Sequence, residues 1–314
     1  MKRLRVAILV GGPSAEHDVS LETGSQVLEY LDQEKYEAFP LFISRGGKWE
    51  MPPENLRIFA DLAFIAMHGE YGEDGTVQDI LEQEGIPYTG SGVLASALGM
   101  NKIFTHRIFR THGLHTPEFL VVNENDNINP EDFDFSSPLV VKPADRGSSV
   151  GVTIVRQAID LEEALRKAHV LSRDALVEKY VPGQELTVSV VEDEDGELNA
   201  LMPLEIIPKM SKFFDYQSKY TTGGADEIIP RLPEYKINFL KEIAKVTHRA
   251  IGASGMSRTD MILSPDDKVY VLEINTIPGM TKNSSLPKAA ELSGLSFSQV
   301  LDKIISRAYK KNAL

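Results

Sequence analysis

Two carboxylates and one amide stand on a predicted β-hairpin near the end of the chain. Its two arms are residues 258–263 and 268–275. Because side chains alternate between the faces of a strand, Glu273 and Asn275 share a face, and an antiparallel partner can bring Asp260 opposite them. Mg²⁺ prefers such oxygen donors, and it commonly takes one or two carboxylates together with water and nucleotide phosphates. The hairpin therefore predicts a magnesium–nucleotide site.

The same hairpin has a simpler interpretation and carries a further charge. Val269 and Val271 precede Glu273 and are expected on the same face of the strand. This pattern also fits an ordinary hairpin with one solvent-exposed face. Arg258 projects to the side of the carboxylates, where it can stabilise a developing oxyanion. The loop 276–285 then offers backbone N–H groups and hydroxyls that suit a substrate carboxylate, although an ordinary turn would look similar.

Two lysines stand where they can hold phosphate groups. Lys142 ends an apolar strand and precedes the small, hydroxyl-rich loop 143–149, whose backbone N–H groups can cover phosphate oxygens. Lys102 can supply a second positive charge. Taken singly, Lys142 and its loop could be an ordinary hairpin with a polar turn, and Lys102 could be a solvated lysine on a helix. The two lysines together are stronger evidence for a phosphate site than either one alone.

Two polar segments near the N-terminus are further candidates for ligand contacts. The turn 11–14 follows a strand but lacks both the dinucleotide glycine spacing and a P-loop lysine. Glu16 comes next, where open α/β sheets usually bind ligands, and its carboxylate suits an ammonium group. A capped helix with an acidic turn is the alternative. His68 opens the glycine-rich loop 68–75, although a lone histidine at a strand end is more often structural.

The elements that must position these residues fall into three predicted domains. In the first, residues 1–98, apolar strands alternate with helices, which is typical of a parallel α/β sheet. The second, residues 99–183, combines strands and turns with a helix over 161–168 into an α+β unit, and helices over 92–113 bridge it to the first. The third, residues 184–314, holds the hairpin, a long polar loop over 209–231 and a final helix over 297–309 that packs as core.

The bulk composition excludes several classes of function. A chain of 314 residues is long enough for two or three domains. The formal net charge of −13 argues against a nucleic-acid partner, because phosphate backbones are held by clustered Lys and Arg. The absence of cysteine excludes disulfides, thiolate zinc sites and a cysteine nucleophile. No apolar run approaches the roughly 18 residues of a membrane span, so we expect a cytoplasmic protein without a membrane partner.

These motifs, taken in order, resemble the D-alanine:D-alanine ligases of the ATP-grasp superfamily over essentially the whole chain. The matching segments are 11–20, 68–75, 90–102, 141–151, 177–185, 219–220 and 258–281. The resemblance implies an N-terminal Rossmann-like parallel-sheet domain followed by a two-domain ATP-grasp unit. It also implies a homodimer that uses ATP and two Mg²⁺ ions, which Mn²⁺ can replace.

The resemblance further assigns roles to single residues. The ATP contacts it implies are Lys102, Lys142, Ser148 and Lys219 at the phosphates, Glu178, Lys179 and Val181 at adenine, and Glu185 at ribose. The metal ligands it implies are Asp260, Glu273 and Asn275. The substrate contacts it implies are Glu16 and His68 at the first D-alanine, and Ser284 and Ser285 at the second D-alanine. Arg258 and the Gly279 amide are implied to form the oxyanion site. Residues 209–231 are implied to form a lid, in which Tyr220 links to Glu16 and Ser148.

The implied reaction activates one D-alanine as an acyl phosphate, which the amine of a second D-alanine then attacks. A related ligase that takes D-lactate, D-serine or another amino acid as its second substrate is the nearest alternative. Phe214, Arg231 and Ser285 depart from the commonest family pattern and bear on lid contacts and on strictness for that substrate. A catalytically silent nucleotide-binding protein and a nicotinamide-dependent oxidoreductase are more distant alternatives, and the second lacks its glycine fingerprint.

Overall fold

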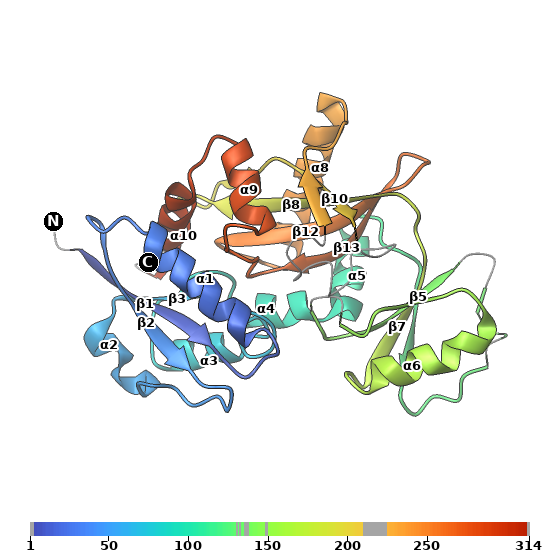
Figure 1. The fold of residues 1–314 in the computed structure, drawn as a ribbon, viewed down its shortest axis with the longest axis horizontal. Coiled ribbons are helices and arrows are strands. Elements are labelled where there is room, and N and C mark those ends of the chain that lie inside the picture. Colours follow the sequence, from blue (N-terminus) through green and yellow to red (C-terminus); the bar gives the residue numbers. More distant parts are fainter. Residues whose placement is uncertain are drawn as a thin grey trace.

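The computed structural model describes residues 3–129, 131, 133–134, 138–147, 150–209 and 225–312 (Figure 1). The predicted contacts at Ser148, Lys219 and Tyr220 therefore lie outside the described residues, as does Phe214. Within these described ranges, three β-sheets follow one another, and each falls within one of the three predicted domains. The mixed α/β fold class, with a parallel sheet first and antiparallel sheets after it, is confirmed.

The first sheet is parallel and has the strand order β2-β1-β3. Its central strand reads as a continuous apolar run because both of its faces are covered, and Val6 to Leu9 are fully buried. The elements of this part are β1 (Leu4–Gly11), α1 (His17–Tyr30), β2 (Tyr36–Ile43), α2 (Leu56–Phe59), β3 (Leu62–Ile65) and α3 (Thr76–Gln83). This arrangement brings the segments after β1 and β3 to the same edge of the sheet.

Two helices connect this part to the rest of the molecule: α4 (Val93–Met100) and α5 (Lys102–Thr111) (Figure 1). Asn101 separates them and caps α5, because its side-chain oxygen accepts hydrogen bonds from the backbone N–H groups of Ile103 and Phe104. This cap makes Lys102 the first residue of α5. The prediction of helices over 92–113 is confirmed.

The second sheet is antiparallel and has the order β4-β7-β5-β6. Its strands are β4 (Phe119–Asn123), β5 (Leu139–Pro143), β6 (Thr153–Val155) and β7 (Asp174–Lys179), and α6 (Leu161–His169) packs on one face. Leu161, Ala164, Leu165 and Ala168 form the apolar stripe of α6 that contacts this face. The opposite face, with Lys142, is turned to a cavity.

The third sheet has the order β11-β10-β8-β12-β13, with β9 on β8. Its strands are β8 (Gln184–Glu192), β9 (Leu198–Ala200), β10 (Leu204–Pro208), β11 (Ala225–Ile228), β12 (Met256–Leu263) and β13 (Val269–Asn275), followed by α9 (Ser285–Leu292) and α10 (Phe297–Asn312); α8 (Glu234–Ala250) precedes β12. Strand β11 corrects the expectation of a loop throughout 209–231, because it pairs with β10 as an edge strand.

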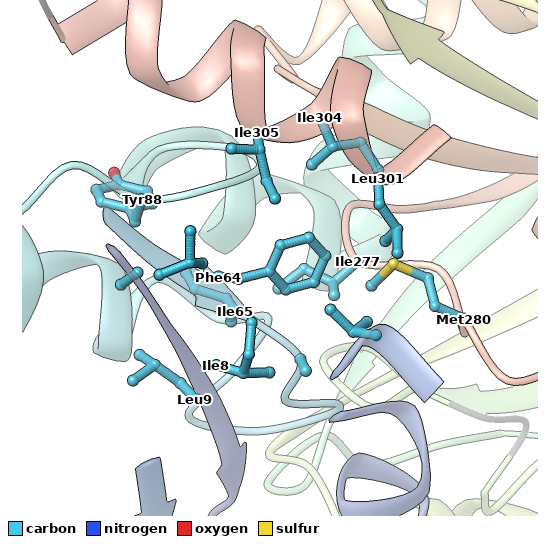
Figure 2. Packing of buried hydrophobic residues seen from close by; sticks show 14 of the residues in the cluster. Ile8, Leu9, Phe64, Ile65, Tyr88, Ile277, Met280, Leu301, Ile304 and Ile305 are labelled. Atoms are coloured by element: carbon cyan, nitrogen blue, oxygen red, sulfur yellow. The ribbon is translucent and has the colours of Figure 1, made fainter. Parts of the chain in front are cut away.

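The largest hydrophobic core joins the first sheet to the last two helices (Figure 2). Phe64 and Ile65 of β3 belong to the same buried cluster as Leu301, Ile304 and Ile305 of α10. The expected packing of the last helix as core is therefore confirmed, and its partners are the N-terminal sheet, α1, α9 and β8. Among the described residues, no helix has both the length and the apolarity needed to cross a membrane.

A buried polar network fixes α10 at the end of β8. The Glu192 carboxylate accepts hydrogen bonds from the Gly255 amide at 2.8 Å and from Arg307 Nε at 2.7 Å, and His248 Nε2 lies 3.4 Å away. Burial alone would raise the pKa of Glu192, but these partners outweigh burial and lower it to about 2.

Candidate active site

One cavity of about 590 Å³ lies where the two antiparallel sheets meet the N-terminal part. Every predicted site residue within the described ranges lines it. These residues are Glu16, His68, Lys102, Lys142, Glu178, Lys179, Val181, Glu185, Arg258, Asp260, Glu273, Asn275, Gly279, Ser284 and Ser285. The chain thus brings together residues that lie up to about 270 positions apart in the sequence.

The β12–β13 hairpin places the predicted metal ligands side by side. Asp260 is directly opposite Glu273, and Arg258 is directly opposite Asn275. The register shifts after Asp260, and this bulge leaves Leu272 as the additional residue of β13. The three oxygen donors therefore face the cavity together, as the alternation of side chains predicted.

The bulge corrects one expectation about this strand. Val269 and Val271 were expected on the face of Glu273, but both lie in the core cluster behind the sheet. Because one extra residue reverses the alternation, Ile274 joins that core instead, and Leu272 and Glu273 both line the cavity. The carboxylate face is therefore separate from the apolar face.

The carboxylates of the hairpin already contact basic groups. Arg258 donates two hydrogen bonds to Asp260, at 2.9 Å from Nε and 2.8 Å from Nη2, and Thr187 Oγ1 donates a third at 2.7 Å. Lys102 Nζ lies 3.3 Å from Glu273 Oε2. Such pairs reduce the unfavourable free energy of burying a charge.

Two carboxylates and one amide oxygen on one face fit a magnesium site that is completed by water and phosphate oxygens. Asn275 Oδ1 also accepts a hydrogen bond from the Ile277 amide at 2.8 Å, which fixes the orientation of the side chain. Within the described ranges, no group of three or more His, Cys, Asp or Glu side chains is arranged to hold a metal. Because water and nucleotide phosphates usually complete the coordination of Mg²⁺, two carboxylates and one amide suit an ion that arrives with a nucleotide.

Lys102 is held at the cavity by its position at the start of α5. Its backbone N–H donates to Ala144 O at 2.8 Å, and its Nζ donates to Arg146 O at 2.6 Å. Both acceptors belong to the loop that follows Lys142. The buried ammonium group thus lies beside the loop that follows Lys142, where it can attract phosphate, whereas the first three amides of α5 already donate to protein acceptors.

Lys142 and Glu178 come from adjacent antiparallel strands. Val140 is directly opposite Glu178, so Lys142, two residues further on, lies on the same face. The Lys142 Nζ atom is 2.8 Å from Glu178 Oε1, and both side chains are buried. A hydrogen-bond donor and an acceptor therefore stand next to each other at this end of the cavity.

The opposite end of the cavity is acidic. Glu16 lies just before α1, and Gly69 gives it room, because a Cβ atom at position 69 would lie 2.7 Å from Glu16 Oε2. His68 is buried between Thr23 Oγ1, 2.8 Å from Nε2, and Glu73 Oε1, 3.4 Å from Nδ1. Burial would lower the pKa of His68, but Glu73, together with Glu16 and the Ile277 backbone, outweighs burial and raises it. This end suits an ammonium group.

A third part of the cavity is formed by the start of α9. Gly279 lies against Ser284, because a Cβ atom at position 279 would be 2.8 Å from Ser284 Oγ. The Ser284 hydroxyl also accepts a hydrogen bond from the Thr281 amide at 3.2 Å. Backbone N–H groups at a helix N-terminus together with serine hydroxyls suit a carboxylate.

Comparison with known families identifies the chain. Residues 108–306 match the family model described as the D-ala D-ala ligase C-terminus, and residues 5–59 and 51–91 match the N-terminus model. The chain belongs to the D-alanine–D-alanine ligase family. This ligase is 41% identical over 313 residues to the D-alanine–D-alanine ligase of Geobacter sulfurreducens, covering 99% of this chain and 96% of that protein.

Solved structures agree with this assignment. The D-alanine–D-alanine ligase of Bacillus anthracis complexed with ATP is 32% identical to the ligase, with a TM-score of 0.83 and 99% of each chain covered. The D-Ala:D-Ser ligase VanG of Enterococcus faecalis is 31% identical, with a TM-score of 0.85, covering 98% of this chain and 100% of that one. The resemblance inferred from the motifs is thereby confirmed at the level of family and fold.

Several polar residues of the cavity were not predicted as site residues. They include Glu73, Arg146, Thr187, Glu227 and Lys288. Glu73 and Arg146 lie in the glycine-containing loops 68–75 and 143–149, which the sequence already indicated as ligand-contacting segments. Their position in these loops could therefore have predicted them as site residues. Thr187 can be recognised as a site residue only from the structure, in which β8 places it directly opposite Asp260 of β12. Glu227, which accepts hydrogen bonds from Ser285 Oγ at 2.7 Å and Lys288 Nζ at 2.9 Å, lies in the strand missed by the sequence.

Proposed function

We propose that the ligase uses ATP to join two D-alanine molecules into D-alanyl-D-alanine, a building block for peptidoglycan precursors. The observation that carries this proposal is the distribution of charge in one cavity. An acidic end at Glu16, a pair of buried lysines, a carboxylate hairpin and a helix N-terminus at Ser284 all face the same space. These features match, in turn, an ammonium group, phosphates, a divalent cation and a second carboxylate.

The nucleotide end supports ATP as the phosphate donor. The neighbouring Glu178 acceptor and Lys142 donor complement the amino group and N7 of adenine, which are a donor and an acceptor side by side. Lys179, Val181 and Glu185 continue this wall of the cavity and are proposed to contact the base and the ribose. The lysines at 102 and 142 are proposed to meet the phosphates.

In the first proposed step, a carboxylate oxygen of the first D-alanine attacks the γ-phosphorus of ATP. The bond between that phosphorus and the β-phosphate oxygen breaks, ADP leaves with the electron pair, and D-alanyl phosphate forms. Glu16 orients this D-alanine through its ammonium group, with His68 beside it. Positioning and charge neutralisation are the main contributions of a protein to phosphoryl transfer.

In the second proposed step, the amine of the second D-alanine attacks the acyl carbon. The carbon–oxygen bond to phosphate breaks, the amide bond forms, and the nitrogen loses a proton. We assign the stabilisation of the oxyanion to Arg258 and the Gly279 amide, and the binding of the incoming carboxylate to Ser284 and Ser285, all of which line the cavity. No protein nucleophile is needed in either step.

Asp260, Glu273 and Asn275 are the residues that would hold Mg²⁺, and we propose two ions, as in the family pattern. Bound there, Mg²⁺ neutralises charge on the transferred phosphate group. The assignment also leads us to propose a cytoplasmic homodimer. Light scattering coupled to size exclusion measures the oligomeric state, and a monomer at working concentrations would contradict that part of the proposal.

Phosphate release from ATP and Mg²⁺ tests the function directly. D-alanine, L-alanine, D-lactate and D-serine are supplied in parallel, and the products are identified by mass spectrometry. We expect release with D-alanine and a D-alanyl-D-alanine product. Release with L-alanine but not with D-alanine would overturn the proposal, whereas preferential incorporation of D-serine or D-lactate would reassign the second substrate.

A further inference from the structure

A buried histidine outside the predicted site connects the two walls of the nucleotide cavity. His106, on α5, is fully buried. Its Nε2 atom is 2.9 Å from Leu272 O, and because a carbonyl only accepts, this nitrogen carries the proton and donates. Leu272 is the bulge residue that separates the apolar face of β13 from the face with Glu273. The histidine therefore donates to the carbonyl of the residue at which the side chains of β13 change their alternation between the two faces of the sheet.

The other side of the imidazole ring faces the second sheet. Its Nδ1 atom lies 3.6 Å from Glu178 Oε1 and has no hydrogen-bond partner among the described residues. The ring also makes an edge contact with Phe119, at 5.2 Å between centroids, and Phe119 is directly opposite Glu178 across β4 and β7. One side chain thus contacts both the strand of the metal carboxylate and the strands of the nucleotide carboxylate.

The protonation state of the ring agrees with this geometry. Burial lowers the pKa of His106 to about 4, an effect that exceeds the opposing influence of Glu178. The ring is therefore neutral near pH 7, with its one proton on Nε2. The charge of Glu178 is balanced by Lys142, 2.8 Å away, and not by the histidine. A neutral spacer behind Glu178 keeps that carboxylate available as an acceptor.

We propose that His106 is a positioning residue: it donates to the Leu272 bulge, its ring packs against Phe119 and beside Glu178 without a hydrogen bond to that carboxylate, and it so sets the selectivity of the cavity for an adenine nucleotide. The proposal rests on the function proposed above, in which Glu178 accepts a hydrogen bond from the adenine amino group. Guanine presents a carbonyl oxygen at the equivalent place, which a carboxylate repels. Displacing Glu178 weakens the favourable contact with adenine and relieves the repulsion with guanine.

Three substitutions separate positioning from bulk packing. His106→Leu removes both nitrogens, whereas His106→Gln keeps an N–H group able to donate to Leu272 O. His248→Leu is the matched control, because His248 is equally buried on a helix and bonds to Ser257 Oγ at 2.7 Å, away from the cavity. His106→Phe, which keeps the ring contact with Phe119, replaces the leucine variant if thermal denaturation shows that the latter does not fold.

The measurement is the binding of ADP and of GDP by calorimetry, followed by ATP kinetics. For His106→Leu we expect at least tenfold weaker ADP binding, a comparable loss of preference for ADP over GDP, and a raised KM for ATP with kcat within threefold of the starting protein. His106→Gln should stay within threefold throughout. His248→Leu should lose thermal stability but keep the nucleotide preference.

Unchanged ADP binding and preference in His106→Leu would overturn the proposal. Equal losses in the leucine and glutamine variants, or an equal loss of preference in the His248 control, would overturn it as well. ADP binding does not require turnover. A starting protein that binds ADP but releases no phosphate with D-alanine would therefore refute the proposed function and leave the role of His106 open to the same binding test.

Discussion

Replacing Glu273 with glutamine removes one charge from the cavity and preserves the size of the side chain. Glu273 lies opposite Asp260 and 3.3 Å from Lys102 Nζ, so the substitution changes the hairpin's charge without changing its register. If Glu273 is one of two carboxylates that hold Mg²⁺, the variant loses part of the field that stabilises the transferred phosphate group. Losing one such preorganised contact typically costs about 3–4 kcal/mol, or roughly 10²–10³-fold in kcat.

The same substitution should have only a small effect on folding. The Glu273 side chain is 24% exposed, and its pairing with Lys102 is offset by the desolvation of both groups. The glutamine oxygen can still accept a hydrogen bond from Lys102. We therefore expect a loss of about 1 kcal/mol in the free energy of unfolding, which corresponds to a Tm lower by roughly 2 °C for a chain of this size.

Steady-state phosphate release at saturating ATP and D-alanine, over a range of Mg²⁺ concentrations, measures the effect. Asp266→Asn is the matched control, since it makes the same chemical change at the exposed turn of the same hairpin, where Asp266 pairs with its neighbours Ser264 and Lys268. The control should keep full turnover. A Glu273→Gln enzyme within threefold of full turnover at all Mg²⁺ concentrations would refute the assignment of the hairpin as a metal site.

Three further predictions concern other parts of the molecule. Gly279→Ala should raise the KM for the second D-alanine about tenfold, because its Cβ would lie 2.8 Å from Ser284 Oγ; an unchanged KM would show that the serine can move away. Asn101→Ala should cost about 1 kcal/mol of stability and raise the KM for ATP through Lys102, as measured by chemical denaturation and kinetics. The pKa of Glu192 is lowered to about 2 in the folded protein. The ionised Glu192 carboxylate therefore adds to the free energy of unfolding above about pH 4.5, and this stabilisation is lost as pH falls toward 2. This contribution is at most roughly 3 kcal/mol, and denaturation of Glu192→Gln across this pH range should lack the corresponding slope.

The sequence was sufficient wherever a local pattern decides the structure. The fully apolar run of β1 predicts a strand covered on both faces, and the alternation in β12 and β13 brings Asp260, Glu273 and Asn275 to one side. The residues of the candidate site could be predicted together because each of the loops that carry them follows a strand or helix with a clear local pattern. Assigning substrates to the site, however, required the resemblance to a family.

The features that the sequence did not predict depend on distant partners. The bulge at Leu272 is visible only in the pairing of β13 with β12, and the Leu272 carbonyl accepts from His106, which lies 166 residues earlier. His106 lies between Ile103 and Phe109 at helical spacing, on the buried face of α5, but this spacing does not reveal which groups its ring nitrogens meet. Strand β11 is four residues long, and its pairing with β10 defines it. No window of sequence contains these contacts.

The charges of the cavity also explain how a chain with a net charge of −13 can bind an anionic nucleotide. Its two buried lysines each lie beside a carboxylate, Lys102 near Glu273 and Lys142 near Glu178, so their charges are locally balanced and both ammonium groups avoid the full desolvation penalty. A balanced site offers little net attraction to a free polyphosphate. An anion that arrives with its own divalent cation meets complementary groups for both charges, and this pairing favours the magnesium complex of ATP over ATP alone.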